Sequence, residues 1–539
     1  MNLVEALAES ARQQPDTIGL KLPIREGKQL SYKDRSFAAM HHEVDLLATY
    51  LFSKKFSRGK KVLILLPPGE DLLIAVFALL RLGAIPVVID PGMGLKNFVA
   101  CTRKTQPDFL LASPKARLPL FLLKGWIRFK KVIFITSKLK QKLKKQNFVC
   151  HLQQENDLEA TAAVLFTSGS TGAPKGAVYT YQDFNAQIEA LQQLFKIQAG
   201  EVDLPLLPVF SLYNPAFGMT TVVPEMNPSH PSRLNPAYIA EALQTCSVTH
   251  SFGSPRLWTK IVEYCERKNL SFPALKRVFL AGAPVHPHLL KRVQDLLPNG
   301  TAYTPYGATE ALPIACISAR EVLEETYQQT LAGKGTCVGK LVEGVEVRIV
   351  PISDEAVDVL PSELPQGEIG EIVVCAPYIS KSYLNNPEAT QKAKIRFNGK
   401  IWHRMGDLGY KDAQGRLWFC GRKVERVVTP QKTYYTDCCE AIFNAHKEVF
   451  RSALIAFKHK EVVVPAMVIE PKKNVSKADR VALLEALRLH AKTCSETTPI
   501  QHFAIFKNFP VDVRHNAKIH RLTLMKYFAK NPKKMMHLG

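Results

Sequence analysis

The sequence lacks any apolar run that is long enough to cross a membrane. Its most apolar stretch, residues 72–80, is followed closely by Arg81 and Gly83, whereas a membrane-spanning helix needs roughly 20 apolar residues. Residues 1–16 lack the basic start and apolar centre of a secretory signal, and they predict an amphipathic helix instead. We therefore expect neither a signal peptide nor a transmembrane segment.

Paired cysteine motifs are also missing. The 11 cysteines form no Cys-x-x-Cys pair, and only Cys438 and Cys439 are adjacent. This scatter argues against a zinc cluster and against a disulfide framework. The sequence also contains no internal repeat and no low-complexity segment. We expect reduced cysteines and a cytoplasmic location, with any peripheral contact at the inner face of the membrane.

Acidic residues are too few to balance the basic ones. The chain has 48 Asp and Glu against 71 Lys and Arg, a formal net charge of +23. Much of the excess lies in residues 123–148 and in the C-terminal tail. Because no recognition motif for nucleic acid accompanies this charge, nucleic acid is not an expected partner.

Residues 123–148 allow two interpretations. Aromatic and apolar residues alternate there with cations, a pattern compatible with contact to an anionic membrane. The simpler interpretation is a strand followed by a solvated basic helix. Under the membrane hypothesis the contacts would come from five lysines: Lys138, Lys140, Lys142, Lys144 and Lys145.

Length and composition predict a globular protein of more than one domain. The 539 residues are too many for one ordinary core. A hydrophobic fraction of 46% and a charged fraction of 22% are typical of folded proteins. Disorder is therefore not expected.

Strand-like and helix-like runs alternate through the first 300 residues. The strand-like runs are residues 60–67, 84–90, 131–136, 162–168 and 277–284. The helix-like runs are residues 71–83, 184–195 and 287–297. This alternation is the βαβ pattern of doubly wound parallel sheets.

The pattern changes twice toward the C-terminus. After about Val338, β-rich runs punctuated by glycine predict a smaller antiparallel subdomain, and after residue 422 helices and strands predict a compact α+β module. We expect an α/β fold whose large N-terminal domain has doubly wound mixed sheets and a β-rich subdomain. The predicted domains are residues 1–421, which bind AMP and the acyl substrate, and residues 422–539, a mobile domain on a hinge.

One loop combines glycine, hydroxyl and lysine residues. Residues 165–176 read LFTSGSTGAPKG and follow an apolar run. Glycines let backbone N–H groups converge on an anion, so the loop predicts phosphate binding. A Walker P-loop would need a hydroxyl residue directly after the lysine and a helix after that. Here Gly176 follows Lys175 and a strand-like AVYTY comes next, so a Walker-type NTPase is disfavoured.

The loop resembles the phosphate loop of the adenylate-forming superfamily, which includes acyl-CoA synthetases, luciferases and adenylation domains of nonribosomal peptide synthetases. Further motifs occur in the family order, and the resemblance covers essentially the whole chain. They are AGAP at 281–284, YGATE at 306–310, HRMGDLG at 403–409, GR at 421–422 and NAKIHR at 516–521. Each string is weak evidence alone, but their common order is strong evidence.

The resemblance implies ATP and Mg²⁺ as cofactors. Nucleotide-binding residues would be Thr167, Ser168, Gly169, Ser170, Thr171, Gly172, Lys175, Gly282, Ala283, Pro284, Tyr306, Gly307, Ala308, Asp407 and Arg422. Catalytic residues would be Lys518, Glu310 and Thr309. In these roles Lys518 reaches the substrate carboxylate and the α-phosphate, Glu310 binds the metal, and Asp407 holds the ribose. A carboxylate that attacks ATP meets another anion, so the reaction needs cations and convergent donors.

The chain departs from the family where a thiol would be accepted. Val424 stands at the hinge position, and residues 208–211 read PVFS without the usual histidine. Residues 429–440, which in thioester-forming members line the pantetheine tunnel, contain no glycine and place Tyr434 and Tyr435 there. These departures put transfer to coenzyme A in doubt.

Longer stretches, among them residues 203–226, 304–315 and 403–423, resemble the β-lactone synthetases of bacterial long-chain olefin biosynthesis. That resemblance implies adenylation of a long-chain 2-alkyl-3-hydroxy acid and then attack by its own β-hydroxyl, with His403 as one candidate base. The hydroxy fatty acid, ATP and other enzymes of a lipid or olefin pathway would be the partners. Two alternatives stay open: a long-chain acyl-CoA or acyl-AMP ligase, and a catalytically silent lipid- or nucleotide-binding protein at the membrane.

Overall fold

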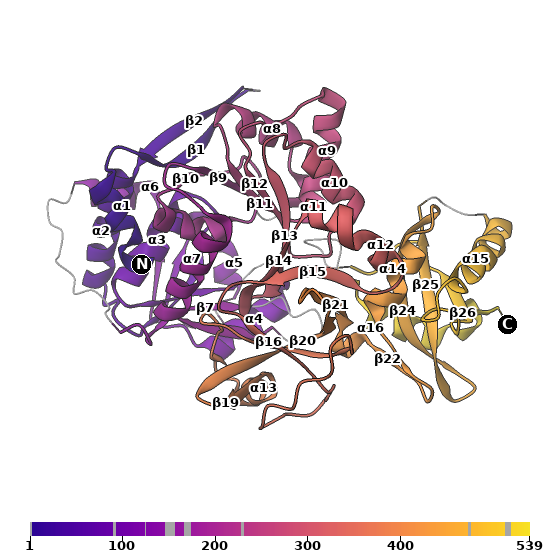
Figure 1. Cartoon of the computed structure of the whole chain (residues 1–539). Coiled ribbons are helices and arrows are strands. Elements are labelled where there is room, and N and C mark those ends of the chain that lie inside the picture. Colours follow the sequence, from indigo (N-terminus) through magenta and orange to yellow (C-terminus); the bar gives the residue numbers. More distant parts are fainter. Residues whose placement is uncertain are drawn as a thin grey trace.

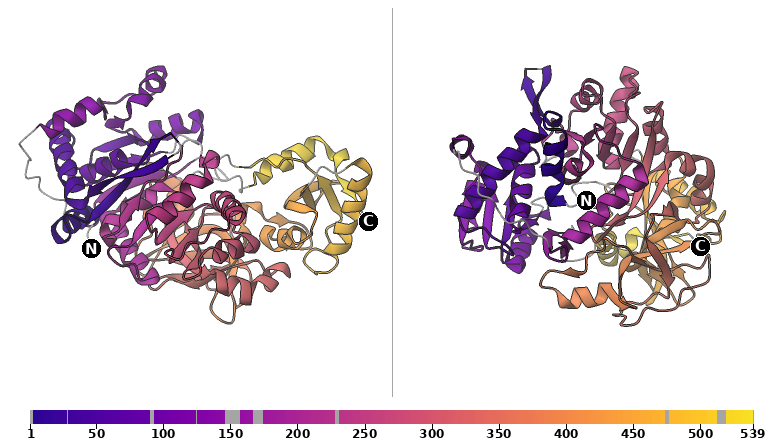
Figure 2. Two further views of the ribbon diagram at one scale, coloured as in Figure 1. Left: turned by 90° about the horizontal axis from the view of Figure 1, so that it is seen from above. Right: turned by 60° about the vertical axis from the view of Figure 1, so that its left-hand side comes forward.

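The computed structural model describes residues 3–27, 29–89, 93–123, 125–145, 157–166, 174–227, 231–472, 476–511 and 519–538. It has a mixed α/β fold with a large, sheet-rich N-terminal domain and a smaller C-terminal domain (Figure 1). The yellow C-terminal elements stand to one side of the N-terminal body, and Figure 2 shows this separation from above. The predicted fold class is confirmed.

Seven strands form the first sheet, in the order β18-β8-β7-β4-β3-β5-β6. They are β3 (Lys61–Leu65), β4 (Ile85–Val88), β5 (Phe109–Ala112), β6 (Lys131–Phe134), β7 (Thr161–Phe166), β8 (Gly176–Thr180) and β18 (Ser382–Tyr383). The neighbours from β7 to β6 run parallel, whereas β8 and β18 are antiparallel to their neighbours. The four strands predicted in this region are therefore present.

Helices cover both faces of the first sheet. They are α1 (Leu3–Gln13), α2 (Phe37–Ser53), α3 (Glu70–Arg81), α4 (Leu95–Thr105), α5 (Arg117–Leu122), α6 (Ser137–Lys144) and α7 (Tyr181–Phe195). Successive residues of β3 enter different cores: Val62 and Ile64 join α2 and α3, whereas Leu63 joins α4. Because both faces are buried, the strand is apolar from Val62 to Leu65.

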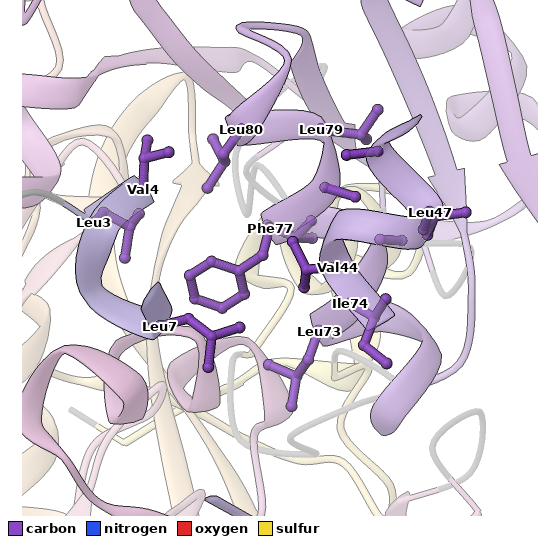
Figure 3. Close-up of a cluster of buried hydrophobic side chains, with 14 of the residues drawn as sticks. Leu3, Val4, Leu7, Val44, Leu47, Leu73, Ile74, Phe77, Leu79 and Leu80 are labelled. Carbon is purple, nitrogen blue, oxygen red and sulfur yellow. The ribbon is translucent and has the colours of Figure 1, made fainter. Parts of the chain in front are cut away.

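Helix α3 is buried on nearly all sides. Its residues from Leu73 to Leu80 are all buried, as expected for a helix between a sheet and other helices. In Figure 3 the ring of Phe77 lies between Leu3 and Leu7 of α1 and Val44 of α2. This packing explains why the stretch with the highest apolar content is a core helix.

The second sheet has 14 strands, with the main order β16-β17-β20-β21-β15-β14-β13-β12-β11-β9-β10-β1-β2 and β19 beside β20. They are β1 (Ile18–Glu26), β2 (Gln29–Ser36), β9 (Val202–Pro205), β10 (Thr220–Val222), β11 (His250–Gly253), β12 (Arg277–Leu280), β13 (Thr301–Ala308), β14 (Ala311–Ser318), β15 (Thr336–Leu341), β16 (Glu346–Val350), β17 (Gly370–Cys375), β19 (Lys394–Phe397), β20 (Lys400–Lys411) and β21 (Leu417–Arg422). Strands from β1 through β10 and β9 to β13 are parallel, and those from β14 onward are antiparallel. The predicted antiparallel subdomain is present, and β15 joins it to the parallel strands.

Further helices pack beside this sheet. They are α8 (Pro236–Thr245), α9 (Pro255–Lys268), α10 (Pro287–Asp295), α11 (Ala319–Glu321), α12 (Tyr327–Leu331) and α13 (Pro387–Ala393), with a 3₁₀ helix η3 (Pro208–Phe217). The apolar sides of α8, α9 and α10 share one core with β9 and β12, centred on the fully buried Trp258. The carboxyl ends of these parallel strands form the edge where α/β proteins bind ligands.

The C-terminal domain has a four-stranded sheet in the order β24-β25-β26-β27. The strands are β24 (Val449–His459), β25 (Val462–Pro471), β26 (His502–Ile505) and β27 (Met536–His537), and a hairpin of β22 (Val427–Val428) and β23 (Thr433–Tyr434) precedes them. The helices are α14 (Thr436–Asn444), α15 (Lys477–Ala491) and α16 (Arg521–Lys530). Two apolar clusters on this sheet draw only on residues after 426. Since β21 runs through residues 421 and 422, a domain boundary between them stays a prediction.

Helix α14 joins the C-terminal domain to the large sheet. The hydroxyl of Thr336 on β15 donates a hydrogen bond to Asp437 Oδ2 on α14 at 2.5 Å. Burial raises the pKa of Asp437 to about 6, although the Thr336 hydrogen bond acts in the opposite direction. Gly333 lies beside the same helix with a φ of +79°, and a Cβ there would come within 2.9 Å of Ile442. This junction therefore depends on a small residue and a buried carboxyl group.

The basic segment contains the strand β6 and the helix α6, as the simpler interpretation predicts. Two of its lysines pair with the protein's own carboxylates. Lys140 contacts Asp71, and Lys144 lies 3.4 Å from Glu43. Of the helices in the described part of the chain, none combines the length and apolar character that a bilayer crossing requires.

Candidate active site

The YGATE residues span the end of β13 and its turn into β14. A Cβ on Gly307 would lie 2.5 Å from the carbonyl oxygen of Ala311, so only glycine fits this turn. The hydroxyl of Tyr179 donates to the carbonyl oxygen of Thr309, and the Ser380 amide donates to that of Glu310 at 2.9 Å. The turn is therefore fixed by the first sheet on one side and by the segment before β18 on the other.

Glu310 holds a buried carboxylate inside this turn. Only 9% of the residue is exposed, and the Tyr383 hydroxyl donates to its Oε1 at 2.6 Å. Burial raises the pKa of Tyr383, and the Glu310 carboxylate adds to that shift, so the phenol remains a donor. Tyr383 thereby orients the carboxylate that the sequence assigns to the metal.

Two lysines face the Tyr383 ring. Lys175 Nζ lies 5.0 Å from the ring centroid, and Lys394 Nζ lies 6.0 Å from it. Lys394 is buried at the start of β19, with its Nζ 3.4 Å from Ser380 Oγ. Burial lowers the pKa of Lys394 to about 7, although Glu310 and Asp183 oppose the shift. The cluster thus places positive charge beside Glu310.

His403 is buried behind these lysines. Burial holds its pKa well below the usual range, and Lys394 and Lys175 add to the shift. Its Nδ1 lies 3.2 Å from the carbonyl oxygen of Ala393, which suits a neutral ring that donates there. As a base His403 would therefore be weak.

Asp407 joins the β13 motif to the start of the hinge. It lies on β20 and is 2% exposed. The Tyr306 hydroxyl donates to its Oδ2 at 2.6 Å, and Arg422 Nη1 lies 2.8 Å from Oδ1. Asp407 raises the pKa of Arg422, and burial raises that of Tyr306 with Asp407 adding to the shift. The three residues predicted from separate motifs therefore form one cluster.

Residues 282–284 follow the carboxyl end of β12. Gly282 has a φ of +88°, a conformation that glycine adopts without strain. The neighbouring strands β11 and β13 end at the same edge, so Gly282, Ala283 and Pro284 lie at the edge where nucleotides bind in such sheets. Their predicted role in nucleotide binding is compatible with this placement.

Some predicted residues lie outside the described residues. They are Thr167, Ser168, Gly169, Ser170, Thr171, Gly172 and Lys518. Close neighbours of Lys518 are described: Ile519 pairs with Val511, and Arg521 donates to Glu425 Oε2 and Glu440 Oε2, both at 2.7 Å. Glu425 belongs to the turn η6 (Lys423–Glu425) that follows β21. The residues that directly follow Lys518 in the sequence are therefore anchored next to the hinge.

The loop proposed to close the thiol route is the hairpin β22–β23 and the start of α14. Tyr434 is buried at 4% exposure, and Lys432 lies 4.8 Å from its ring centroid. Tyr435 is half-buried, and burial raises its pKa. The hinge residue Val424 is mostly exposed. Tyr434 and Tyr435 are thus both packed against their surroundings in this loop.

An apolar cavity lies beside η3, the helix that contains residues 208–211. It has about 40 Å³ and is lined by Leu212 and Tyr213 together with residues of α1, α3, β4, β7 and α7. Tyr213 donates to Gln187, which in turn donates to the carbonyl oxygen of Leu312. A volume of this size holds about one water molecule and not an alkyl chain. This cavity by itself is therefore too small for a long acyl chain.

Residues 7–384 match the family described as AMP-binding enzyme, which is most of the chain. The chain belongs to the AMP-binding enzyme family. Its predicted membership of the adenylate-forming superfamily is thereby confirmed, and it is an enzyme of the ATP-using type.

Two relatives of this AMP-binding enzyme match over nearly their full length. It is 38% identical over 542 residues to the olefin β-lactone synthetase of Stenotrophomonas maltophilia (strain K279a), with 96% of each chain covered. It is 36% identical over 538 residues to the olefin β-lactone synthetase of Xanthomonas campestris pv. campestris, again with 96% of each covered. The resemblance to the olefin β-lactone synthetases is therefore confirmed.

A solved structure shows the same fold. It is O-succinylbenzoate coenzyme A synthetase from Bacillus subtilis in complex with ATP and a magnesium ion, with a TM-score of 0.75 and 21% identity. The match covers 97% of this AMP-binding enzyme and 99% of that chain. At this identity the likeness supports the fold, and the roles of single residues stay predictions.

Sequence reasoning missed part of the site. Tyr383, Lys394, Ser380 and Tyr179 belong to no short motif that indicates catalysis, yet they surround Thr309 and Glu310. One signal was available for Lys394, because it directly precedes Ile395 at the start of a strand-like run. A lysine at a buried strand position is unusual enough to suggest a role.

Proposed function

We propose that this protein is an ATP-dependent β-lactone synthetase that acts on a long-chain 2-alkyl-3-hydroxy acid. The observation that carries the proposal is the identity of 36% and 38% to two olefin β-lactone synthetases over 96% of the chain. In the first step a carboxylate oxygen attacks the α-phosphorus of ATP and pyrophosphate leaves. In the second step the β-hydroxyl oxygen attacks the acyl carbon, AMP leaves, and the hydroxyl proton passes to a base.

The described residues suit the first step. Tyr306, Asp407 and Arg422 form the proposed ribose site, and Lys175 lies where the departing phosphates are expected. Lys518 is the proposed catalytic cation, since charge develops on the α-phosphate in the transition state. Together these residues bind the nucleotide by its ribose and phosphates while the acid approaches.

The residues around Glu310 fit a magnesium ion. Among the residues that the structure describes, no group of three or more metal-binding side chains is arranged to hold a metal by itself. A single buried carboxylate oriented by Tyr383 instead suits Mg²⁺, which usually binds one or two carboxylates together with substrate phosphates and water. When bound, Mg²⁺ would supply positive charge that offsets the negative charge of the phosphates.

The second step separates this proposal from the ligase alternative. A hydroxyl already attached to the substrate reacts within one molecule, so no thiol passage is needed. The loop at residues 429–440 supports a closed route, because it contains no glycine that would give a thiol arm room to pass the backbone. We propose that coenzyme A is not an acceptor.

The deciding experiment compares two acids of equal chain length, one with and one without the 3-hydroxyl. We expect the hydroxy acid to release AMP over many turnovers without coenzyme A and to give a β-lactone by mass spectrometry. The 3-deoxy acid should stop at a bound acyl-AMP. Acyl-CoA formation from the 3-deoxy acid would establish the ligase alternative, and absence of pyrophosphate release from both acids would leave only the silent binding protein.

We also propose a cytoplasmic enzyme that meets an anionic membrane through α5 and the loop after it. Four large apolar residues there are exposed, namely Leu118, Phe121, Leu122 and Trp126, at 69%, 71%, 70% and 60%. Exposed cations, Lys115 and Arg128 among them, flank these residues, which matches an interfacial segment on anionic lipid. In the left-hand view of Figure 2 purple helices from this part of the chain stand out from the N-terminal body. Such a surface suits a long-chain acid, and enzymes that supply the acid and consume the lactone are the expected pathway partners.

Flotation with vesicles tests the membrane contact. The wild type should float with vesicles that contain anionic lipid, less so at high salt, and the double variant Phe121→Asp/Leu122→Asp should lose this binding. Val359→Asp is the matched control, since Val359 is exposed in a different loop. Binding that persists in the double variant, or equal binding to neutral vesicles, would contradict the assignment to α5.

A further inference from the structure

Lys394 is a buried cation that the proposed reaction has not yet used. It is the first residue of β19, directly after α13, and only 8% of it is exposed. Its Nζ lies 3.4 Å from Ser380 Oγ and faces the Tyr383 ring at 6.0 Å. No carboxylate hydrogen-bonds it within the described part of the chain, although Glu310 and Asp183 are near enough to favour its charged form.

Burial of such a group is costly for folding. A lysine amine that leaves water without a paired carboxylate loses solvation that one hydroxyl contact does not replace. Asp183 is itself engaged, because it accepts a hydrogen bond from the Thr180 amide at 2.8 Å at the start of α7. A purely structural role would be met better by an apolar side chain, so the amine suggests a partner that enters the site.

The neighbours of Lys394 indicate where a ligand for its amine would bind. Tyr383 lies between Lys394 and Lys175 and donates to Glu310, the proposed metal ligand. Lys175 closes the glycine-rich loop, and His403 is near enough to both lysines for each to lower its pKa. The two cations therefore act on the same small region, the side of the site where β- and γ-phosphates are expected.

We propose that Lys394 is a positioning residue for the polyphosphate half of ATP, a buried amine held at a fixed place whose positive charge favours triphosphate and pyrophosphate over monophosphate. The proposal rests on the proposed function, because it assumes a nucleotide at this site. It acts through Tyr383 and Glu310 as well, since a cation beside Tyr383 helps to hold the phenol that orients the carboxylate. An incoming polyphosphate adds negative charge next to the amine and so stabilises its protonated form.

The proposal predicts a difference between two nucleotides. AMP carries only the phosphate next to the ribose, whereas a non-hydrolysable ATP analogue also carries the two phosphates near Lys394. Removing one buried unit charge at this range should weaken binding of the analogue by at least about tenfold and binding of AMP by less than about twofold. A substitution that disturbed the fold would instead weaken the binding of both nucleotides to the same extent.

Isothermal titration calorimetry of the full-length protein measures both affinities with magnesium present. Lys394→Met tests the charge, and Lys394→Arg should keep the preference for the analogue to within about threefold. Lys392→Met is the matched control: Lys392 lies two residues earlier on α13, is exposed, and pairs with Glu388 at 3.0 Å. If Lys394→Met does not fold, Lys394→Gln carries the same comparison.

Each outcome is decisive. If the wild type binds neither nucleotide, the proposed function fails. If the wild type binds both, and the Met or Gln variant loses them equally or loses neither, the role of Lys394 is overturned. A selective loss of the analogue, with kcat for adenylation reduced less than the KM for ATP is raised, supports the proposal.

Discussion

Glu310 illustrates how much chemistry rests on one buried side chain. Its carboxylate is fixed by Tyr383, and its backbone by Ser380. Glu310→Gln keeps the size of the side chain and leaves an amide oxygen for Tyr383, but it removes the charge that a magnesium ion requires. We expect adenylation to fall by at least about 100-fold, the scale of losing one electrostatic contact in a transition state.

Pyrophosphate release at saturating substrate measures this effect. Glu324→Gln is the control, because Glu324 is exposed and pairs only at the surface with Arg320 at 3.0 Å. A Glu310→Gln enzyme with more than a third of the wild-type rate would remove Glu310 from the metal site.

Lys518 is the second residue whose loss should stop the first step. The family resemblance assigns it to the α-phosphate, and Arg521, which follows it closely in the sequence, donates to Glu425 of the hinge turn. Lys518→Ala should leave the fold intact and lower adenylation by at least about 100-fold, because the developing charge loses its cation. Lys526→Ala on the exposed side of α16 is the control. A loss below threefold in Lys518→Ala would exclude Lys518 from the mechanism.

At the scale of residues, the sequence predicted the site residues that lie in recognisable motifs. Tyr306, Asp407 and Arg422 come from three motifs, and the structure brings them into contact. Tyr383 and Lys394 were not predicted, because their function depends on contacts between β18, β19 and the β13–β14 turn. The place of Lys394 at the start of a strand-like run suggests a role, but neither that signal nor a single tyrosine reveals which residues will be in contact.

The elements next to the hinge are held by an ionic network. Arg521 at the start of α16 bonds Glu425 of the hinge turn and Glu440 of α14, and all three side chains are largely buried. Burial raises the pKa of Glu425, while Arg521 lowers it. Arg521→Met would leave two buried carboxylates without their cation, a change that typically costs about 3 kcal/mol of folding free energy.

Urea unfolding of the full chain measures this loss of folding free energy, when it is followed by the fluorescence of probes placed in the C-terminal domain. Lys458→Met is the control, since Lys458 is exposed on β24 and pairs with Glu461 near the strand turn. Because Ile519 and Lys518 precede Arg521, the same variant should also reduce adenylation. Unchanged stability together with unchanged activity would mean that the network is not required at the hinge.

At the scale of elements, apolar sequence patterns predicted the buried helices and strands. They did not predict strands that are largely exposed. Helix α3 and strand β3 were predicted from their unbroken apolar runs. The hairpin β1–β2 was not predicted, because it is at the edge of the large sheet and much of it is exposed. Its attachment depends on parallel pairing of Leu20 with Thr221, which are about 200 positions apart, and local sequence does not encode that contact.

The whole molecule depends on how its two domains meet. Sequence composition predicted a separate C-terminal module, but it did not predict which surface the module contacts. The structure places Asp437 of α14 against Thr336 of β15, in a junction that also includes Gly333. Side chains from residues about 100 positions apart create this contact, so motif order alone does not reveal it.

Asp437 predicts a pH dependence of domain docking. Its pKa is raised to about 6 in this arrangement by burial, so the docked arrangement binds the proton more tightly than an undocked one does. The resulting stabilisation is fully present below the ordinary aspartate range near pH 4 and is lost as the pH rises through about 6. We therefore expect the domains to separate more readily at pH 7.5 than at pH 5, which small-angle scattering detects as a larger radius of gyration.

Two variants test the assignment to Asp437. Asp437→Asn mimics the neutral carboxyl group and should keep the compact form at both pH values. Asp412→Asn changes a carboxylate that binds Arg416 within the N-terminal domain, so it should leave the pH response in place. If the wild type and Asp437→Asn respond equally to pH, another group controls the junction. A greater separation at pH 5 than at pH 7.5 would contradict the sign itself, because it would require the undocked form to bind the proton more tightly.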